Sequence, residues 1–284
     1  MLARLAVVSL VVLLVWGNVV AGLKVGLACP DWPLCHGKVI PPLRWDIYAE
    51  FLHRVIGAFV AVLVIWLSVR RMKVYAGPAK SVPVLTVTLL VAQIILGGAV
   101  VLMKIPTDLT TVHFANGILI FCLTLYMSRF DGAGGGLRTS GAGGMWFMFA
   151  SVVFIQAVAG AFVRHSHAGL ACGEDFPKCL GVWVPGELSG TVLYHFSHRI
   201  LGYVIVLFAV GMAVFSHTSA GRAERKAAYV ILASVLVQII IGVGMIHSGL
   251  QFAATALHLL VALHILSYSL LRWFNSGSEP VAVR

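Results

Sequence analysis

The chain of 284 residues is 60% hydrophobic and only 11% charged, and its mean hydropathy is +0.97. Soluble domains average about 45–50% apolar and about 25% charged residues, so this composition excludes an ordinary soluble enzyme, a disordered chain and a nucleic-acid-binding module. The formal net charge of +10 is then best explained by membrane topology, because Lys and Arg accumulate in cytoplasmic loops. The sequence predicts an integral membrane protein.

Eight stretches are apolar over the roughly 20 residues that a transmembrane helix needs. In chain order they are approximately Leu5–Leu23, Phe51–Val69, Val82–Leu102, Leu109–Met127, Met145–Val163, Val192–Phe215, Ala227–Ile246 and Phe252–Leu271. The first stretch also fits a cleaved signal peptide, because Arg4 precedes it and small residues lie near Ala21. We expect it to be retained, since it is long enough to span and has an internal counterpart that cannot be cleaved.

The basic residues predict the orientation of the spans. An even number of spans puts both termini on one side, and the segments on that side carry most of the Lys and Arg, which are Arg4, Arg70, Arg71, Lys73, Lys80, Arg129, Arg138, Arg222, Arg225, Lys226, Arg272 and Arg284. The other side holds Lys24, Lys38, Arg44, Lys104, Arg164 and Lys178, with Arg54 and Arg199 at helix entrances. This asymmetry predicts that both termini are cytoplasmic and that the two long loops face outward from the cell membrane.

An internal repeat divides the chain. A shift of 145 positions places His53-Arg54 on His198-Arg199, Gln93 on Gln238 and His113 on His258. With smaller shifts, Asn18–Gly22 aligns with Gln156–Gly160 and Gly26–Cys29 with Gly169–Cys172. We therefore expect an all-α protein of two pseudo-symmetric four-helix bundles.

The repeat also sets the expected domains, which are an N-terminal half, 1–130, a Gly-rich flexible cytoplasmic linker, 131–144, and a C-terminal half, 145–284. Four spans per half give the two halves one orientation, which argues against a transporter built from inverted repeats.

Four histidines occupy repeated positions at the outer ends of spans: His53 and His113 in the first half, His198 and His258 in the second. Polar groups in the hydrocarbon region are costly, so they are functional candidates, although a hydrogen-bonded structural role is the alternative. Two imidazoles from facing helices are what a six-coordinate haem iron needs, whereas a zinc or di-metal site would want thiolates or carboxylates in the same layer. The pattern predicts one haem site in each half.

Arg54 and Arg199 directly follow a histidine in each half. A guanidinium at this depth can pair with a haem propionate, and repetition in both halves favours that role over a simple interfacial anchor.

Glu50 lies one helical turn before His53, whereas the equivalent residue of the second half is His195. A carboxylate beside a macrocycle can take protons during an oxidation, and the alternative is an exposed acid at a helix N-terminus.

Four of the five cysteines form two close pairs in the outer loops, Cys29 with Cys35 and Cys172 with Cys179. An oxidising compartment favours two disulfides there, with a structural role more expected than thiol exchange. Cys122 lies within a span and is expected to be inert. Small residues such as Gly242 and Gly244 permit close helix packing, within the chain or in a homo-oligomer.

The loop Cys29-Pro30-Asp31-Trp32-Pro33-Leu34-Cys35, the motif Glu50-Phe51-Leu52-His53-Arg54 and the duplicated histidines together resemble the haem A synthase family over nearly the whole chain. The resemblance implies a membrane oxidoreductase that oxidises a methyl group of haem O to the formyl group of haem A for haem-copper oxidase assembly. It implies a haem b (iron) cofactor on His198 and His258, a substrate haem on His53 and His113, and Glu50 as the carboxylate needed for the reaction.

Expected partners are haem O, the lipid bilayer, haem O synthase, cytochrome oxidase subunits and a membrane electron acceptor, with no nucleic acid. The competing interpretation is a di-haem b-type electron-transfer cytochrome that does not modify its haem.

Overall fold

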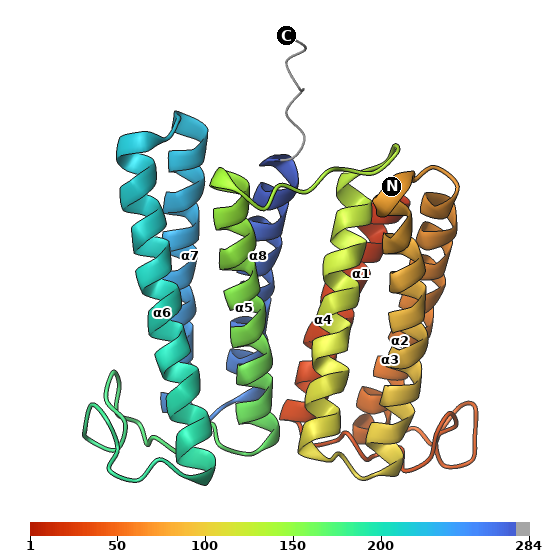
Figure 1. Ribbon diagram of the computed structural model, residues 1–284. Coiled ribbons are helices and arrows are strands. Elements are labelled where there is room, and N and C mark those ends of the chain that lie inside the picture. Colours follow the sequence, from red (N-terminus) through yellow and green to blue (C-terminus); the bar gives the residue numbers. More distant parts are fainter. Residues whose placement is uncertain (277–284) are drawn as a thin grey trace. The chain divides into compact units, whose positions relative to one another are not determined.

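The computed structural model describes residues 1–276, and its regular structure there consists of helices (Figure 1). Eight of them are long and apolar enough to cross a membrane, which confirms the predicted fold class. Arg284, used above to orient the chain, lies outside the described residues. The helices are α1 (Leu2–Gly22), α2 (Trp45–Met72), α3 (Ser81–Leu102), α4 (Thr107–Arg129), α5 (Gly141–His165), α6 (Gly190–Ser219), α7 (Arg222–His247) and α8 (Phe252–Ser276), with the short 3₁₀ helix η1 (Gly77–Lys80) before α3.

The helices extend beyond the apolar stretches that predict them. Helix α2 runs from Trp45 to Met72, several residues past each end of the expected span. Asp46 lies in its first turn, and Arg70 and Arg71 lie in its last turn. These charges suit the two ends of the helix dipole and can reach the membrane surface, so polar turns continue the helix where hydropathy has already fallen.

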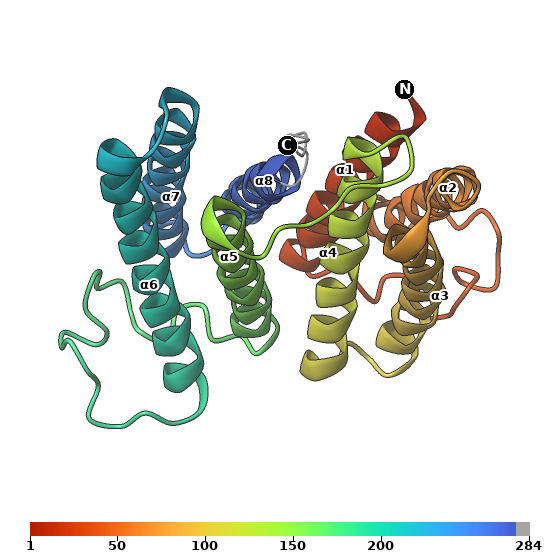
Figure 2. The ribbon, with the colours of Figure 1, turned by 45° about the horizontal axis from the view of Figure 1, so that its top comes forward.

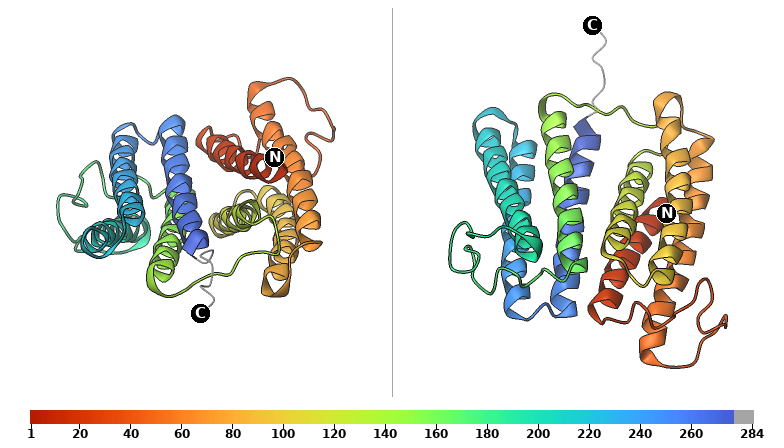
Figure 3. Two further views of the ribbon diagram at one scale, coloured as in Figure 1. Left: turned by 90° about the horizontal axis from the view of Figure 1, so that it is seen from above. Right: turned by 60° about the horizontal axis from the view of Figure 1, so that its bottom comes forward.

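The chain separates into two compact units, Met1–Phe147 together with the described residues from Leu270 onward, and Met148–Ser269. In the first unit, α1 packs on α2 and α4, and α3 packs on the same two helices, which closes a four-helix bundle (Figure 3). In the second unit α6 packs on α7, and Phe149 of α5 meets Phe208 of α6 edge to face at 5.3 Å between ring centroids.

A long disulfide-bonded loop joins the first two helices of each half, α1 to α2 and α5 to α6 (Figure 2). The structure contains the two expected disulfides, Cys29–Cys35 with Cα atoms 4.7 Å apart and Cys172–Cys179 with Cα atoms 4.5 Å apart. Each second cysteine opens a tight turn, Cys35 pairing with Lys38 and Cys179 with Val182. Both central residues of each turn have positive φ, as in a type I′ turn, and glycine fills the second central position.

The segment after α4 is hydrogen-bonded to the first bundle where it begins. The Tyr126 hydroxyl donates to the Gly135 carbonyl at 2.7 Å, and the Tyr75 hydroxyl donates to the Phe130 carbonyl at 2.7 Å. Arg71 donates to the carbonyls of Met127 and Asp131, both at 2.9 Å. The first part of the predicted linker is therefore attached to the N-terminal half by specific contacts.

Candidate haem-binding site

The four repeated histidines lie in the second or third turns of their helices, at the same end of each bundle as its disulfide loop. His53 of α2 and His113 of α4 are close enough to interact electrostatically, and so are His198 of α6 and His258 of α8. All four rings are partly buried, and each has a buried Nδ1 atom without a hydrogen-bond partner in the described chain. Each half thus brings one pair of imidazoles together, and haem ligation by these pairs stays a prediction.

Amide side chains lie beside three of these histidines. The Nε2 of Gln93 is 3.4 Å from the Nε2 of His113, and the Nε2 of Gln156 is equally far from the Nε2 of His198. Gln238 donates to the backbone carbonyl of His258 at 3.0 Å. These glutamines are interhelical hydrogen-bonding groups, as expected from their type.

The structure corrects the alignment of α1 with α5. Gly57 of α2 faces Leu13, and the equivalent Gly202 of α6 faces Gln156. Leu13, and not Asn18, is therefore the counterpart of Gln156. The other three repeated histidines each have a glutamine beside them, whereas His53 has the apolar Leu13 at the corresponding position. The sequence match between Asn18–Gly22 and Gln156–Gly160 failed because small apolar residues recur throughout membrane helices and align in several registers.

Arg54 holds the first disulfide loop against α2. Its Nη1 donates to the carbonyls of Asp31 at 2.7 Å and Leu34 at 2.6 Å, and its Nη2 donates to the carbonyl of Cys29 at 2.8 Å. The same Nη2 forms an ion pair with Glu50 Oε1 at 2.6 Å. The other carboxylate oxygen of Glu50 accepts from the Cys29 amide at 2.7 Å. Glu50 is only 4% exposed, so it is not a solvated acid at a helix terminus.

Arg199 holds the second loop in the same way. Its Nη1 donates to the carbonyls of Asp175 and Lys178, and its Nη2 approaches the carbonyl of Gly173 at 3.5 Å. Its Nε donates to His195 at 3.2 Å, and His195 also accepts from the Cys172 amide at 3.3 Å. His195 therefore takes the structural place of Glu50. The pairing of both arginines with haem propionates stays a prediction, and in this structure their guanidinium groups donate to loop carbonyls instead.

The two sites differ in charge. Glu50 compensates the charge of Arg54 at 2.6 Å. Arg199 is 7% exposed and faces a histidine, and the described residues place no carboxylate within ion-pair distance of it. The carboxyl of Asp175 acts on it only at longer range. The second half thus retains a buried cation that attracts an anionic group, whereas the first half holds a buried ion pair.

The first loop folds over the end of its bundle where His53 and His113 lie. Asp31 accepts from the amides of His36 at 2.6 Å and Gly37 at 2.7 Å. These hydrogen bonds, that of Gly37 foremost, lower the pKa of the Asp31 carboxyl from its ordinary value. The adjacent Trp32 ring lies against Gly98 of α3, because a methyl group built on Gly98 would be 2.9 Å from its Cδ2. Trp32 thereby reaches the helix that flanks His113.

The donor set of each half fits a haem. Among residues 1–276, no group of three or more His, Cys, Asp or Glu side chains could hold a metal ion. A haem needs fewer protein ligands, since the porphyrin supplies four nitrogens and the protein supplies one or two axial ligands. The pair of partly buried imidazoles in each half meets that need.

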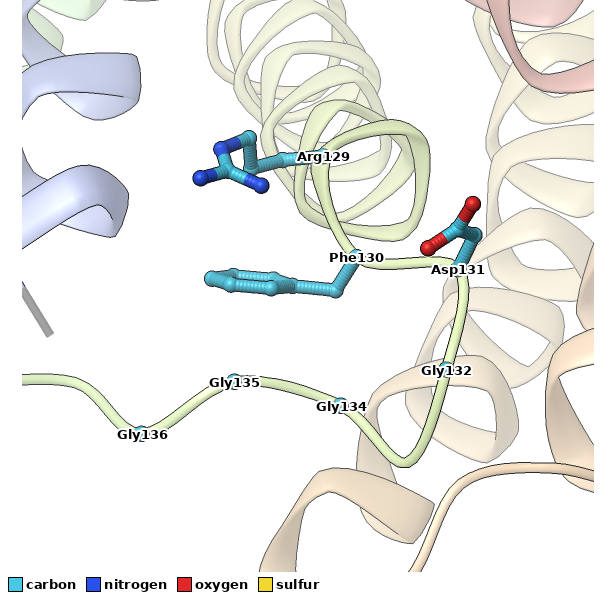
Figure 4. Close-up of a pocket in the computed structure, with 7 residues that line it drawn as sticks. All are labelled: Arg129, Phe130, Asp131, Gly132, Gly134, Gly135 and Gly136. Carbon is cyan, nitrogen blue, oxygen red and sulfur yellow. The ribbon is translucent and has the colours of Figure 1, made fainter. Parts of the chain in front are cut away.

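A pocket of about 380 Å³ lies elsewhere, where α4 ends (Figure 4). It is lined by Arg129, Phe130, Asp131 and the glycines that follow. The 16 residues from His113 to Arg129 correspond to about 24 Å of helix, so this pocket is separate from the histidine site.

The sequence was also compared with known proteins. It matches the cytochrome oxidase assembly protein family COX15-CtaA over residues 1–125 and 47–270. The chain belongs to this family. The match covers both histidine pairs and both disulfide loops, so the family spans the whole of the candidate site.

Similar curated proteins carry a more specific name. Haem A synthase of Symbiobacterium thermophilum is 32% identical over 230 residues, covering 72% of each chain. The haem A synthases of Halalkalibacterium halodurans and Alkalihalophilus pseudofirmus are 27% and 28% identical, each covering 89% of both chains. These relatives favour haem A synthesis over an electron-transfer cytochrome.

Proposed function

We propose that the protein is a membrane oxidoreductase that converts haem O to haem A by oxidising a ring methyl group to a formyl group. The observation that carries this proposal is the combination of two histidine pairs with a single buried carboxylate among residues 1–276, Glu50, placed one helical turn from His53. A cytochrome that only transfers electrons would need the histidines, and His195 of the second half shows that the link to the loop does not itself require a carboxylate. The haem A synthase relatives point to the same reaction.

The charge difference between the halves supports a division of roles. Among residues 1–276, no carboxylate lies at contact distance from the buried Arg199 of the second half, so an anionic haem propionate would compensate its charge. This favours a permanently bound haem b on His198 and His258. Arg54 is already compensated by Glu50, which suits a site on His53 and His113 that a substrate haem enters and leaves.

Glu50 is the residue placed to move a proton. Written with water as the oxygen source, conversion of a methyl to a formyl group releases four electrons and four protons, and a bound haem b would supply a redox centre that passes the electrons singly to the membrane electron acceptor. Protons leave the methyl carbon during this change. The Glu50 carboxylate is the candidate proton acceptor one helical turn from His53 on α2, and its ion pair with Arg54 holds it in place.

We infer that the protein lies in the cell membrane with both termini in the cytoplasm and both haem sites toward the outer face. The disulfides support this orientation, because disulfides form in an oxidising compartment. Arg70, Arg71 and Arg129 support it as well, because they lie at the opposite ends of their helices and basic residues accumulate on the cytoplasmic side. The proposed partners are haem O, a membrane electron acceptor, haem O synthase and cytochrome oxidase subunits.

Extraction and chromatography of the haems in the purified protein test the function. Protein produced together with haem O is expected to contain haem A as well as haem b. Haem b alone, with haem O present in the same membranes, would instead identify a di-haem cytochrome.

A further inference from the structure

Each of the four histidines packs edge-on against a glycine of the preceding helix. We measure this contact by the position that a methyl group would take if it were built on the glycine. That methyl would lie 2.9 Å from His53 Cε1 at Gly17 and 2.8 Å from His198 Cε1 at Gly160. It would lie 3.2 Å from the Cε1 of His113 at Gly97 and 3.2 Å from the Cε1 of His258 at Gly242.

These distances leave no room for a side chain. Real Cβ atoms essentially never approach another heavy atom to under 3.0 Å, so an alanine at Gly17 or Gly160 must move the imidazole or the helix. At Gly97 and Gly242 an alanine would require the ring to give by a few tenths of an ångström. Glycine weakens a helix relative to alanine, so its presence at all four contacts has a packing reason.

The contact falls on Cε1, the ring carbon between the two nitrogens, and Nδ1 lies close to it in every case. The same methyl positions lie 3.4–3.8 Å from the four Nδ1 atoms, and these are the buried atoms that lack hydrogen-bond partners in the described chain. Metal-binding histidines are usually oriented by a hydrogen bond to the nitrogen that does not bind the metal. Here a steric contact with a glycine at Cε1 restrains each ring, whose Nδ1 has no orienting hydrogen bond in the described chain.

A sequence pattern accompanies three of the glycines. Gln93, Gln156 and Gln238 each stand four residues before a glycine, and thus on the same helix face. The pattern Gln-x-x-x-Gly therefore marks the helix face that meets a histidine. In α1 the corresponding pair is Leu13 and Gly17, so the glycine is present where the glutamine is not.

We propose that Gly17, Gly97, Gly160 and Gly242 are positioning residues that fix the ring orientation of the axial haem ligands. The proposal rests on haem ligation by the four histidines. The closer contacts, at Gly17 and Gly160, hold His53 and His198 more strictly than the other two glycines hold His113 and His258. A ligand ring that turns changes the ligand field of the iron without removing the ligand.

The test uses the second half, where the proposed haem b is permanent. Gly242→Ala is compared with Gly244→Ala, a matched control two residues away on α7, because a methyl on Gly244 meets nothing within 4 Å. Gly160→Ala is the stronger variant. Purified proteins are compared by haem content per chain and by electron paramagnetic resonance of the oxidised low-spin haem, whose g values report the mutual orientation of the axial rings.

The expected results are graded. Gly244→Ala matches the wild type, Gly242→Ala retains haem with shifted g values, and Gly160→Ala retains haem about 10-fold more weakly or worse, as when other groups that orient a metal ligand are lost. If Gly160→Ala does not fold, the comparison of Gly242→Ala with Gly244→Ala still decides. Equal g values in those two variants, shifted or not, overturn the proposal.

His198→Ala separates the proposal from the ligand assignment on which it rests. If this variant loses the low-spin spectrum while Gly242→Ala leaves the g values unchanged, the ligands are right and the role of the glycines is wrong. An unchanged spectrum in His198→Ala rejects the ligand assignment, and the positioning role falls with it.

Discussion

At the scale of single residues, Glu50 is engaged in two ways. One carboxylate oxygen accepts from Arg54 and the other from the Cys29 amide, so the side chain joins the disulfide loop to α2. His195 makes the equivalent link in the second half. The bridge is therefore a shared structural feature, and the ionisable carboxylate is what distinguishes the first half. Its structural and chemical roles need a substitution that separates them.

Glu50→Gln and Glu50→Ala make that separation. The glutamine can still accept one of the two hydrogen bonds but cannot accept a proton, so haem A yield should fall about 10²- to 10⁴-fold while haem stays bound. The alanine should lose both the yield and the link to the loop. Yield is measured by haem chromatography, and the loop by hydrogen exchange of a peptide containing Cys29. Asp108→Asn, which removes an exposed carboxylate at the start of α4, serves as the control. Normal yield in Glu50→Gln would remove Glu50 from the chemistry.

At the scale of elements, the helices were predictable and most loop contacts were not. A transmembrane span is recognised by about 20 consecutive apolar residues. The repeated histidines predict which two helices of each half face each other. The hydrogen bonds of Arg54 and Arg199 to the loops could not be predicted, because their acceptors are backbone carbonyls, which every residue type has. The glycine contacts were missed as well, although the repeated Gln-x-x-x-Gly spacing was a signal that could have revealed them.

The two disulfides give a prediction for the loops. Without reductant, a membrane-permeant thiol reagent should leave Cys29, Cys35, Cys172 and Cys179 unmodified in the folded protein. After reduction in denaturant, mass spectrometry should find label on all five cysteines. Each bridge closes a short loop, and its loss should cost about 2 kcal/mol of stability on the chain-entropy estimate. Labelling of any of the four before reduction would contradict the bonded loops.

At the scale of the whole molecule, one design occurs twice with different charges. Each half carries two histidines on glycine contacts and an arginine that holds a disulfide loop. The first half adds a buried carboxylate, whereas the second leaves its arginine without one at contact distance. Duplication explains the shared parts, and the difference in charge supports the proposed substrate site in the first half and the proposed cofactor site in the second.

The haem content of each half tests this account most directly. Haems are extracted from purified wild type, from His53→Ala with His113→Ala, and from His198→Ala with His258→Ala, all produced together with haem O. We predict that the first double variant keeps haem b and lacks haems O and A, and that the second loses haem b. Loss of haem b from the first double variant and its retention in the second would contradict the division of roles.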